Sequence, residues 1–118
     1  MRDHFLEFEI SPELVNEMLE SGEETILLDI REDWEWEKAH LEGAIHIPLD
    51  ELGDRVGELD PRSETVLYCH HGERSIDGCL LLWEHGFRKV RSMTGGIEAW
   101  SKTGRPIQMV AVLSTAAR

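Results

Sequence analysis

A nearly continuous apolar run, Thr25 to Ile30, is the feature that most constrains the fold of this chain. A strand with apolar side chains on both faces must be covered on both faces, which is the situation of strands in parallel sheets. Two further β-prone runs, 65–68 and 89–93, follow, and segments with helical spacing of apolar residues lie between the runs. This alternation predicts an α/β fold with a mostly parallel central sheet of about five strands.

The expected elements follow one another without a linker or an internal repeat. Ser11-Pro12 is typical of an N-cap followed by proline in the first helical turn, and Ser21-Gly22 is typical of a helix end. Strands are expected at 5–10, 25–30, 44–48, 65–68 and 89–93. Helical segments are expected after Ser11, at 31–40 (a loop or short helix), at 49–59, from residue 74 or 75 to 85, and through Ile97 and Trp100. In the helix that ends near His85, the apolar residues Ile76, Cys79, Leu80 and Trp83 form one stripe.

The charge balance is strongly acidic, with 24 Asp and Glu against 12 Lys and Arg and a formal net charge of -12. Nucleic acid is not expected as a partner, because phosphate binding needs clustered cations. A membrane surface is not expected either, because its lipids are anionic. Neither a signal-peptide core nor a run of about 20 apolar residues occurs, so we expect a soluble, cytoplasmic protein. The acidic surface serves solubility or offers a docking face to a basic protein partner.

The two cysteines, Cys69 and Cys79, do not make a disulfide framework, and a reducing compartment fits them better. Cys79 lies within an expected helix and is predicted to be buried and inert. The alternative is a resolving thiol, which would need its sulfur within reach of Cys69.

Cys69 lies between the end of a predicted strand and the start of a predicted helix. The first N–H groups of a helix have no partner within the helix, and the helix dipole adds partial positive charge at that end. Both effects favour the thiolate, which is the nucleophilic form of cysteine. Gly72 allows a tight turn, and the backbone N–H groups from His70 to Ser75 are expected to surround the sulfur. We therefore expect the sulfur of Cys69 to be the reactive atom.

Four stretches of the chain resemble the motifs of a single known family. Leu28 to Arg31 is similar to the family's Asp-x-Arg segment, and His40 to Pro48 is similar to its H-I-x-G-A-x-N-I-P stretch, with His46 in place of the usual Asn. Cys69 to Ser75 resembles the active-site loop Cys-x-x-Gly-x-Arg-Ser, and the stretch from Gly95 to Pro106 resembles the closing G-G-x-x-A-W…G-x-P. By these motifs the chain resembles a single-domain rhodanese-like sulfurtransferase, with the domain at 1–106 and a C-terminal tail at 107–118.

The resemblance implies a three-layer α/β/α fold and a two-step reaction. A donor such as thiosulfate or a persulfide passes one sulfur to Cys69, and a thiophilic acceptor such as cyanide or a thiol removes it. The partners are then a small-molecule donor and acceptor or a protein persulfide, and no metal or organic cofactor is required. Cys69 is the expected catalytic residue, and the expected substrate-binding residues are His70, His71, Gly72, Glu73, Arg74 and Ser75.

Two of the flanking charges leave alternatives open. Arg74 either attracts an anionic donor or pairs with a buried carboxylate such as Asp29. Glu73 either points outward or disfavours thiosulfate as the donor.

The other polar and aromatic residues near these motifs have simpler expected roles. His70 and His71 are expected to be exposed loop residues that contribute mainly backbone amides, and a metal site is not expected because no carboxylate–histidine pattern accompanies them. Asp29 and Arg31 are expected to be structural, and Trp34, Trp36 and Trp100 are expected to pack in the core or at its rim.

Two other functions compete with the sulfurtransferase. Cysteine phosphatases place five residues between the cysteine and the arginine of their loop, whereas only four separate Cys69 from Arg74, which leaves a smaller cradle. The second competing function is a sulfur-relay or protein-interaction module with little thiosulfate turnover. It stays open because a fold does not by itself establish a function.

Overall fold

The structure, a computed structural model, describes residues 8–105 and 107. The beginning of the expected strand at 5–10, the N-terminal segment in which no signal peptide was expected, and nearly all of the expected C-terminal tail lie outside the described residues.

The described elements alternate between strand and helix. In chain order they are β1 (Glu9–Ile10), α2 (Pro12–Glu20), β2 (Thr25–Asp29), α3 (Asp33–Lys38), β3 (Ile45–His46), α4 (Leu49–Leu52), the 3-10 helix η1 (Gly53–Glu58), β4 (Glu64–Tyr68), α5 (Glu73–Glu84), β5 (Val90–Met93) and α6 (Gly96–Lys102). The expected helix at 49–59 is therefore two short pieces, which meet at Gly53. The segment at 31–40, expected as a loop or short helix, contains α3.

The five strands form one sheet in the order β1-β5-β4-β2-β3, and every pairing is parallel. The central strand β4 pairs with β2 along five residues, so that Tyr68 lies opposite Asp29. Since the carboxyl ends of parallel strands share one edge, the residues after β2 and β4 meet there.

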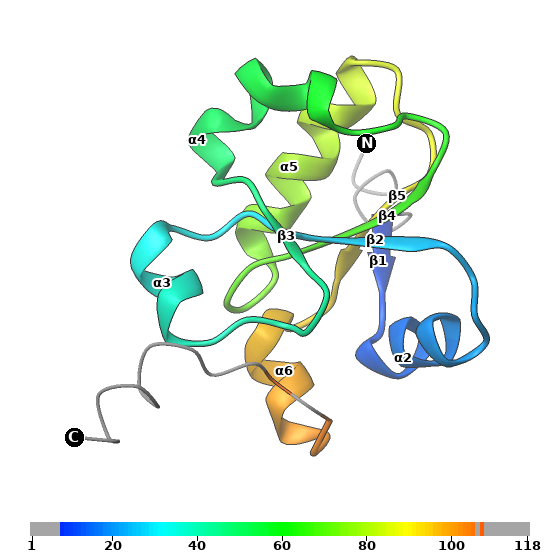
Figure 1. The fold of residues 1–118 in the computed structure, drawn as a ribbon, viewed down its shortest axis with the longest axis vertical. Coiled ribbons are helices and arrows are strands. Elements are labelled where there is room, and N and C mark those ends of the chain that lie inside the picture. Colours follow the sequence, from blue (N-terminus) through cyan, green and yellow to red (C-terminus); the bar gives the residue numbers. More distant parts are fainter. Residues whose placement is uncertain (1–7, 106, 108–118) are drawn as a thin grey trace.

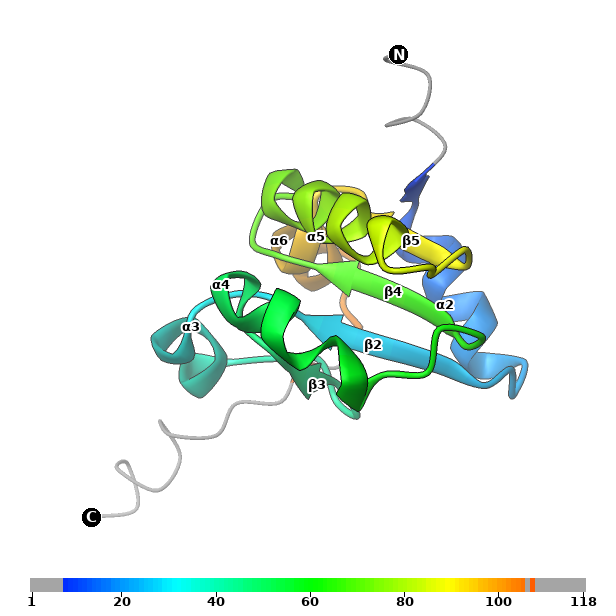
Figure 2. The same ribbon diagram turned by 90° about the horizontal axis from the view of Figure 1, so that it is seen from above.

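Helices cover both faces of the sheet, and each face has its own apolar cluster (Figures 1 and 2). Leu28, Leu67 and Cys69 point to the face covered by α4, η1 and α5. Leu27, Val66 and Tyr68 point to the opposite face, covered by α2 and α6. Neighbouring residues of a strand face opposite ways, so β2 and β4 must be apolar on both sides. The three-layer α/β/α architecture is thereby confirmed.

Helix α2 begins and ends as its sequence predicts. The Ser11 side chain accepts a hydrogen bond from the Leu14 N–H at 3.1 Å, and Pro12 occupies the first turn, where its missing N–H costs nothing. Beyond the other end Gly22 has a φ of 85°, a conformation that favours glycine.

The buried face of α5 differs from the predicted stripe by one position. The residues buried against the sheet are Ser75, Gly78, Cys79 and Leu82, whereas Trp83 is 42% exposed. Gly78 lies so close to β4 that an added Cβ would be 2.6 Å from Leu67 Cδ2. The large Trp83 side chain therefore lies at the surface, where it meets the edge of Phe8 and stacks under Arg88.

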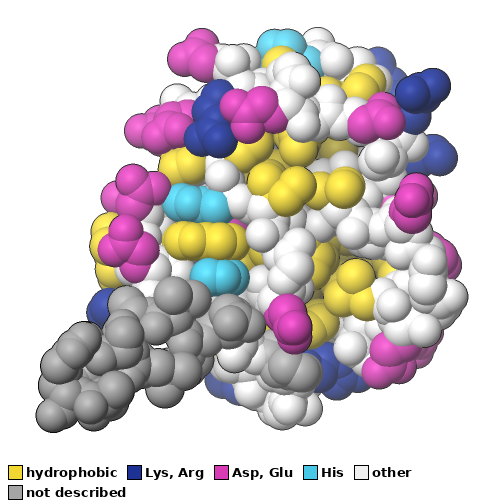
Figure 3. Space-filling view, in the orientation of Figure 1, with side chains coloured by type: hydrophobic (Ala, Val, Ile, Leu, Met, Phe, Trp, Pro, Cys, Tyr) yellow, Lys and Arg dark blue, Asp and Glu magenta, His cyan; other side chains and the backbone are white. Residues whose placement is uncertain are grey.

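Acidic side chains lie along the edges of the face shown in Figure 3, around apolar side chains at its middle. Within the part of the chain that the structure describes, no helix is both long enough and apolar enough to span a bilayer.

Candidate active site

Cys69 directly follows β4 and lies beneath the loop that leads into α5. Its side chain is buried, with 0% of its surface exposed. The Gly72 N–H donates a hydrogen bond to Cys69 Sγ at 3.0 Å. Among the described residues this is the one backbone donor to the sulfur, so the expected ring of N–H groups is reduced to a single close contact. The first turn of α5 starts one residue later, with its partial positive charge toward the loop.

A buried hydroxyl group lies beside the sulfur and contacts a second one. Ser75 Oγ is 3.6 Å from Cys69 Sγ, donates to the Gly72 carbonyl oxygen at 3.2 Å, and lies 2.7 Å from Ser92 Oγ. Ser92 comes from β5 and is as buried as Ser75. The surroundings of the sulfur are therefore polar on this side, although Cys69 belongs to the apolar cluster under α5.

Glycines at the start of α6 lie against the loop that follows Cys69. Gly72, with a φ of 111°, lies so close to Gly95 that an added Cβ would be 3.1 Å from the Gly95 backbone nitrogen. A Cβ at Gly96, whose φ is 62°, would overlap the Cys69 carbonyl oxygen and the His70 backbone. This close approach lets the Ile97 N–H donate to the Cys69 carbonyl at 2.8 Å and the Glu98 N–H donate to the His70 carbonyl at 3.1 Å.

Arg74 forms a bidentate ion pair with Glu35 of α3, with distances of 2.9 and 3.0 Å. The alternative in which Arg74 pairs with a carboxylate is therefore confirmed, but Asp29, the example considered from the sequence, is wrong because it is already bound by Arg31. The hydrogen bonds that Arg74 donates to Glu35 are the main cause that raises the pKa of Arg74. Burial alone would raise the pKa of Glu35, but the hydrogen bonds from Arg74 and from the Glu32 backbone bring it below its ordinary value.

Asp29 and Arg31 tie the end of β2 to its surroundings, as expected. Arg31 Nη2 lies 2.7 Å from Asp29 Oδ2 and donates to the Ala39 carbonyl at 2.6 Å. Beside this pair the Tyr68 hydroxyl accepts from the Leu41 N–H at 3.0 Å. Burial is the main cause that raises the pKa of Tyr68, so this phenol stays neutral.

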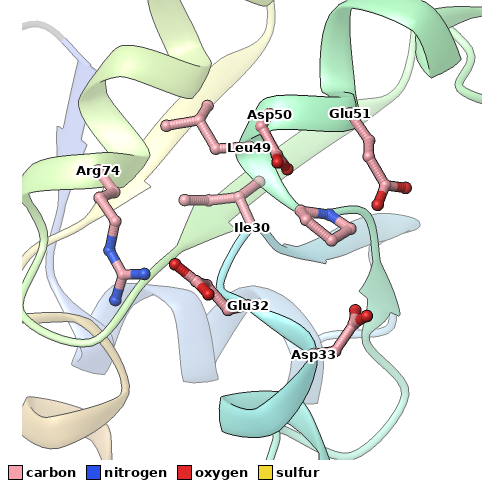
Figure 4. A pocket seen from close by; sticks show the side chains of 8 residues that line it. Ile30, Glu32, Asp33, Leu49, Asp50, Glu51 and Arg74 are labelled. Carbon is pink, nitrogen blue, oxygen red and sulfur yellow. The ribbon is translucent and has the colours of Figure 1, made fainter.

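Two hollows flank the Arg74–Glu35 pair. One, of about 530 Å³, is lined by Ile30, Glu32, Asp33, Pro48, Leu49, Asp50, Glu51 and Arg74. Figure 4 shows Arg74 on one side of it, Asp33 and Glu51 on the other, and Ile30 between them. The second, of about 340 Å³, is lined by Arg31, Trp34, Glu35, Lys38, Ala39, His70 and Ile97.

Cys69 is not among the described residues that line either hollow. Because Arg74 lines the first and Glu35 the second, their ion pair joins the two rims. Four carboxylates line the first hollow with a single guanidinium, which is itself paired, so this hollow is electronegative.

The remaining loop residues point away from the sulfur. Glu73 is exposed, in agreement with the outward alternative. His71 Nε2 lies 2.5 Å from Glu98 Oε1 of α6, and the His70 and His71 rings meet edge to face at 4.2 Å. Glu98 is the residue of this region that sequence reasoning missed, since only the close packing of α6 on the loop brings it there.

Cys79 is buried and free, and burial raises the pKa of its thiol to about 12. The aromatic residues differ in their environments. Trp100 is buried in the core, Trp36 stacks between His40 and His46 at 3.4 and 4.8 Å, and Trp34 is 57% exposed at the second hollow. His46, which replaces the usual Asn, contacts the Arg31 carbonyl oxygen through Nε2 at 2.8 Å.

Comparison with known proteins adds an independent line of evidence. Residues 11–103 match the family model described as Rhodanese-like domain. The chain is 39% identical over 93 residues to the "Putative sulfur carrier protein YrkF" of Bacillus subtilis, covering 79% of this chain and 50% of that protein. It is 32% identical over 99 residues to a "Sulfurtransferase" of Allochromatium vinosum, covering 84% of this chain and 92% of that protein.

A solved structure shares the fold. The rhodanese-like domain of the Anabaena sp. protein Alr3790 superposes with a TM-score of 0.81 at 27% identity, covering 87% of this chain and 80% of that one. The family match spans most of the chain, and the fold and the strand–cysteine–helix loop agree with it. This chain belongs to the family of rhodanese-like sulfurtransferases.

Proposed function

We propose that this protein transfers sulfane sulfur through a persulfide on Cys69. The observation that carries the proposal is the position of Cys69 Sγ at the carboxyl end of the central strand, where it accepts the Gly72 N–H and lies beside the Ser75 hydroxyl. A hydrogen bond to a charged group is worth about 1.5–3 kcal/mol, so the Gly72 N–H favours the thiolate and later the terminal sulfur of a persulfide.

In the first step the Cys69 thiolate attacks the outer sulfur of the donor. With thiosulfate, the new S–S bond forms to Cys69 while the donor's S–S bond breaks, and sulfite leaves with the bonding electron pair. Ser75 can turn its O–H toward the sulfur as charge develops, because Ser92 can donate to Ser75 Oγ in return.

In the second step an acceptor thiolate or cyanide attacks the terminal sulfur of the persulfide. The S–S bond to Cys69 breaks, the product carries the sulfur away, and the Cys69 thiolate is restored. No net oxidant or reductant is consumed over the cycle, which needs only a donor and an acceptor.

The donor must reach a sulfur that has no exposed surface. The loop that contains Gly72 lies directly against it, so movement of this loop precedes the reaction. Arg74 is bound on both of its terminal nitrogens by Glu35, which makes it a poor anchor for a phosphate or sulfonate group as the pair stands.

A second candidate is a sulfur relay in which a protein persulfide is the donor or acceptor. The electronegative hollow beside Arg74 favours it, because four carboxylates repel the thiosulfate dianion and attract a basic segment of a partner. The "sulfur carrier" in the name of the Bacillus subtilis relative agrees with this role.

Mass spectrometry of the intact protein tests both candidates. We expect thiosulfate or an organic persulfide to add one sulfur atom to the wild-type chain and none to Cys69→Ala. Cys79→Ala is the matched control, and we expect it to gain the sulfur as the wild type does. A gain from persulfide alone would select the relay, and no gain from any sulfane donor would refute a Cys69 persulfide.

A further inference from the structure

Three side chains of metal-ligating type, His70, His71 and Glu98, lie together where the loop after Cys69 meets α6. Their donor atoms all lie within 4.8 Å of one another, and His71 Nε2 and Glu98 Oε1 are 2.5 Å apart. The two histidines follow Cys69 directly, whereas the carboxylate comes from the first turn of α6. This is the one such group among the described residues.

The backbone beneath these side chains is fixed. The Glu98 N–H donates to the His70 carbonyl at 3.1 Å, and the Ile97 N–H donates to the Cys69 carbonyl at 2.8 Å. Gly96 allows this contact, since a Cβ there would overlap the loop. The Cα positions of the three ligands are therefore held together without a metal, and only side-chain rotation separates the present arrangement from a coordinating one.

The side chains are accessible and carry suitable donors. His71 is 55% exposed and Glu98 41% exposed, and His70 lines the second hollow. Two imidazole nitrogens and one carboxylate oxygen suit Zn²⁺ and its transition-metal neighbours, whereas Mg²⁺ and Ca²⁺ prefer oxygen ligands throughout. Three protein ligands with a fourth position for water is the usual arrangement of an open zinc site.

We propose that His70, His71 and Glu98 bind a divalent transition-metal ion of the Zn²⁺ class on the outer side of the Cys69 loop. Tetrahedral bonds of about 2.0–2.1 Å place ligand atoms roughly 3.3 Å apart, so the His71–Glu98 contact opens slightly while the wider separations close. The ion takes the place of the direct contact between His71 Nε2 and Glu98 Oε1. Lys102, whose Nζ lies 3.8 Å from the other Glu98 oxygen, competes with the metal and limits its affinity.

Neither cysteine is needed for this site. Cys79 is buried with a raised thiol pKa, and Cys69 Sγ faces Ser75 beneath the loop. The site can therefore be tested in a Cys69→Ala background, where thiolate binding and persulfide chemistry are both removed. A negative result there refutes the metal site and leaves the proposed sulfur transfer untouched.

Calorimetric titration of untagged Cys69→Ala protein with Zn²⁺ is the test. We expect one equivalent to bind with a micromolar dissociation constant, and Mg²⁺ to give no binding. Adding His71→Ala or Glu98→Gln should weaken Zn²⁺ binding at least tenfold. The matched control His85→Ala, which removes another exposed histidine, should leave the affinity unchanged. Equal affinity in all of these variants, or no binding in the parent, would overturn the proposal.

A second measurement guards against variants that merely disturb the loop. Proton NMR of the chain with all its histidines intact follows each imidazole during the Zn²⁺ titration. We expect the His70 and His71 signals to move first, and those of His40 and His46, which both stack on Trp36, to stay in place. If the His40 or His46 signals moved first, the metal would bind at those histidines, and the proposed site would be rejected.

Discussion

At the scale of single residues, the two buried thiols differ in what surrounds their sulfur. Cys69 Sγ has a backbone N–H at 3.0 Å and a hydroxyl at 3.6 Å, whereas for Cys79 burial alone changes the pKa, raising it to about 12. Both side chains are fully covered, so exposure does not distinguish them. The proposed reactivity of Cys69 must therefore come from the hydrogen bond that its sulfur accepts and from the ease with which the covering loop moves.

The raised pKa of Cys79 predicts a loss of stability in alkaline solution. Above the unfolded-state pKa of about 8.5 the unfolded chain releases the thiol proton while the folded chain keeps it until about pH 12. The unfolded state then binds fewer protons, so the free energy of unfolding falls as pH rises, by up to about 1.4 kcal/mol per pH unit.

Urea unfolding at several pH values between about 8 and 10 measures this slope. We expect Cys79→Ala to have a shallower slope than the wild type, whatever its absolute stability. Cys69→Ala is the control that removes the other thiol. Identical slopes in the wild type and Cys79→Ala would contradict the prediction.

At the scale of elements, the start of α6 determines the shape of the loop. Gly96→Ala should both destabilise the protein and slow the alkylation of Cys69, because its Cβ would overlap the Cys69 carbonyl oxygen. Gly22→Ala is the matched control, since Gly22 also has a positive φ of 85° but has nothing within 4 Å of the added Cβ.

Gly22→Ala should lower the free energy of unfolding by about 1–2 kcal/mol, because alanine is disfavoured in the left-handed conformation. Gly96→Ala should cost at least about 2 kcal/mol more, in the range of overpacked core substitutions. Urea unfolding and the rate of iodoacetamide labelling measure the two effects. An equal loss of unfolding free energy in the two variants would show that the loop moves aside for the added Cβ, and would contradict the prediction.

The ion pair between α3 and α5 provides a second test at this scale. Glu35→Gln releases Arg74 beside the active-site loop, so we expect the KM for thiosulfate to fall about fivefold, equivalent to roughly 1 kcal/mol. Glu58→Gln is the control, because it breaks the Arg55 pair on η1 and changes the net charge equally. A KM that does not fall in Glu35→Gln would show that Arg74 takes no part in attracting the donor.

Sequence reasoning was accurate for elements and less so for partners. The N-cap at Ser11 and the doubly buried β2 follow from neighbours in the chain, and both were predicted. The buried face of α5 was misplaced because periodicity counts apolar residues. Ser75 faces inward to meet Ser92, and Gly78 faces inward because Leu67 leaves no room for a side chain.

Partners from distant elements could not be predicted in the same way. The sequence offered Asp29 as an example of a carboxylate partner for Arg74, and the fold pairs Arg74 with Glu35 because Arg31 already holds Asp29. Glu98 joins the histidines only through the tight contact at Gly96. Both pairings depend on how elements distant in the sequence pack together, which no local pattern contains.

At the scale of the whole molecule, charge is the dominant feature. The formal net charge is -12. Four of the acidic side chains line the larger hollow beside Arg74. Long-range repulsion of this kind lowers the encounter rate of anionic reagents and weakens with salt. The favoured partner at this scale is neutral or basic.

Two alkylating reagents of similar size separate this field from the chemistry at Cys69. Iodoacetate is an anion and iodoacetamide is neutral. The rate of Cys69 alkylation by iodoacetate, divided by the rate with iodoacetamide, therefore reports the local electrostatic potential. We expect the ratio at low salt to lie below that of free glutathione, and to rise as ionic strength increases from about 0.01 M to about 0.15 M, where the Debye length falls from roughly 30 to roughly 8 Å. The iodoacetamide rate alone should stay constant and serves as the control for salt effects on the fold. A ratio that falls with salt would mean that Arg74 and the start of α5 attract anions more strongly than the carboxylates repel them, and thiosulfate would then be the better substrate.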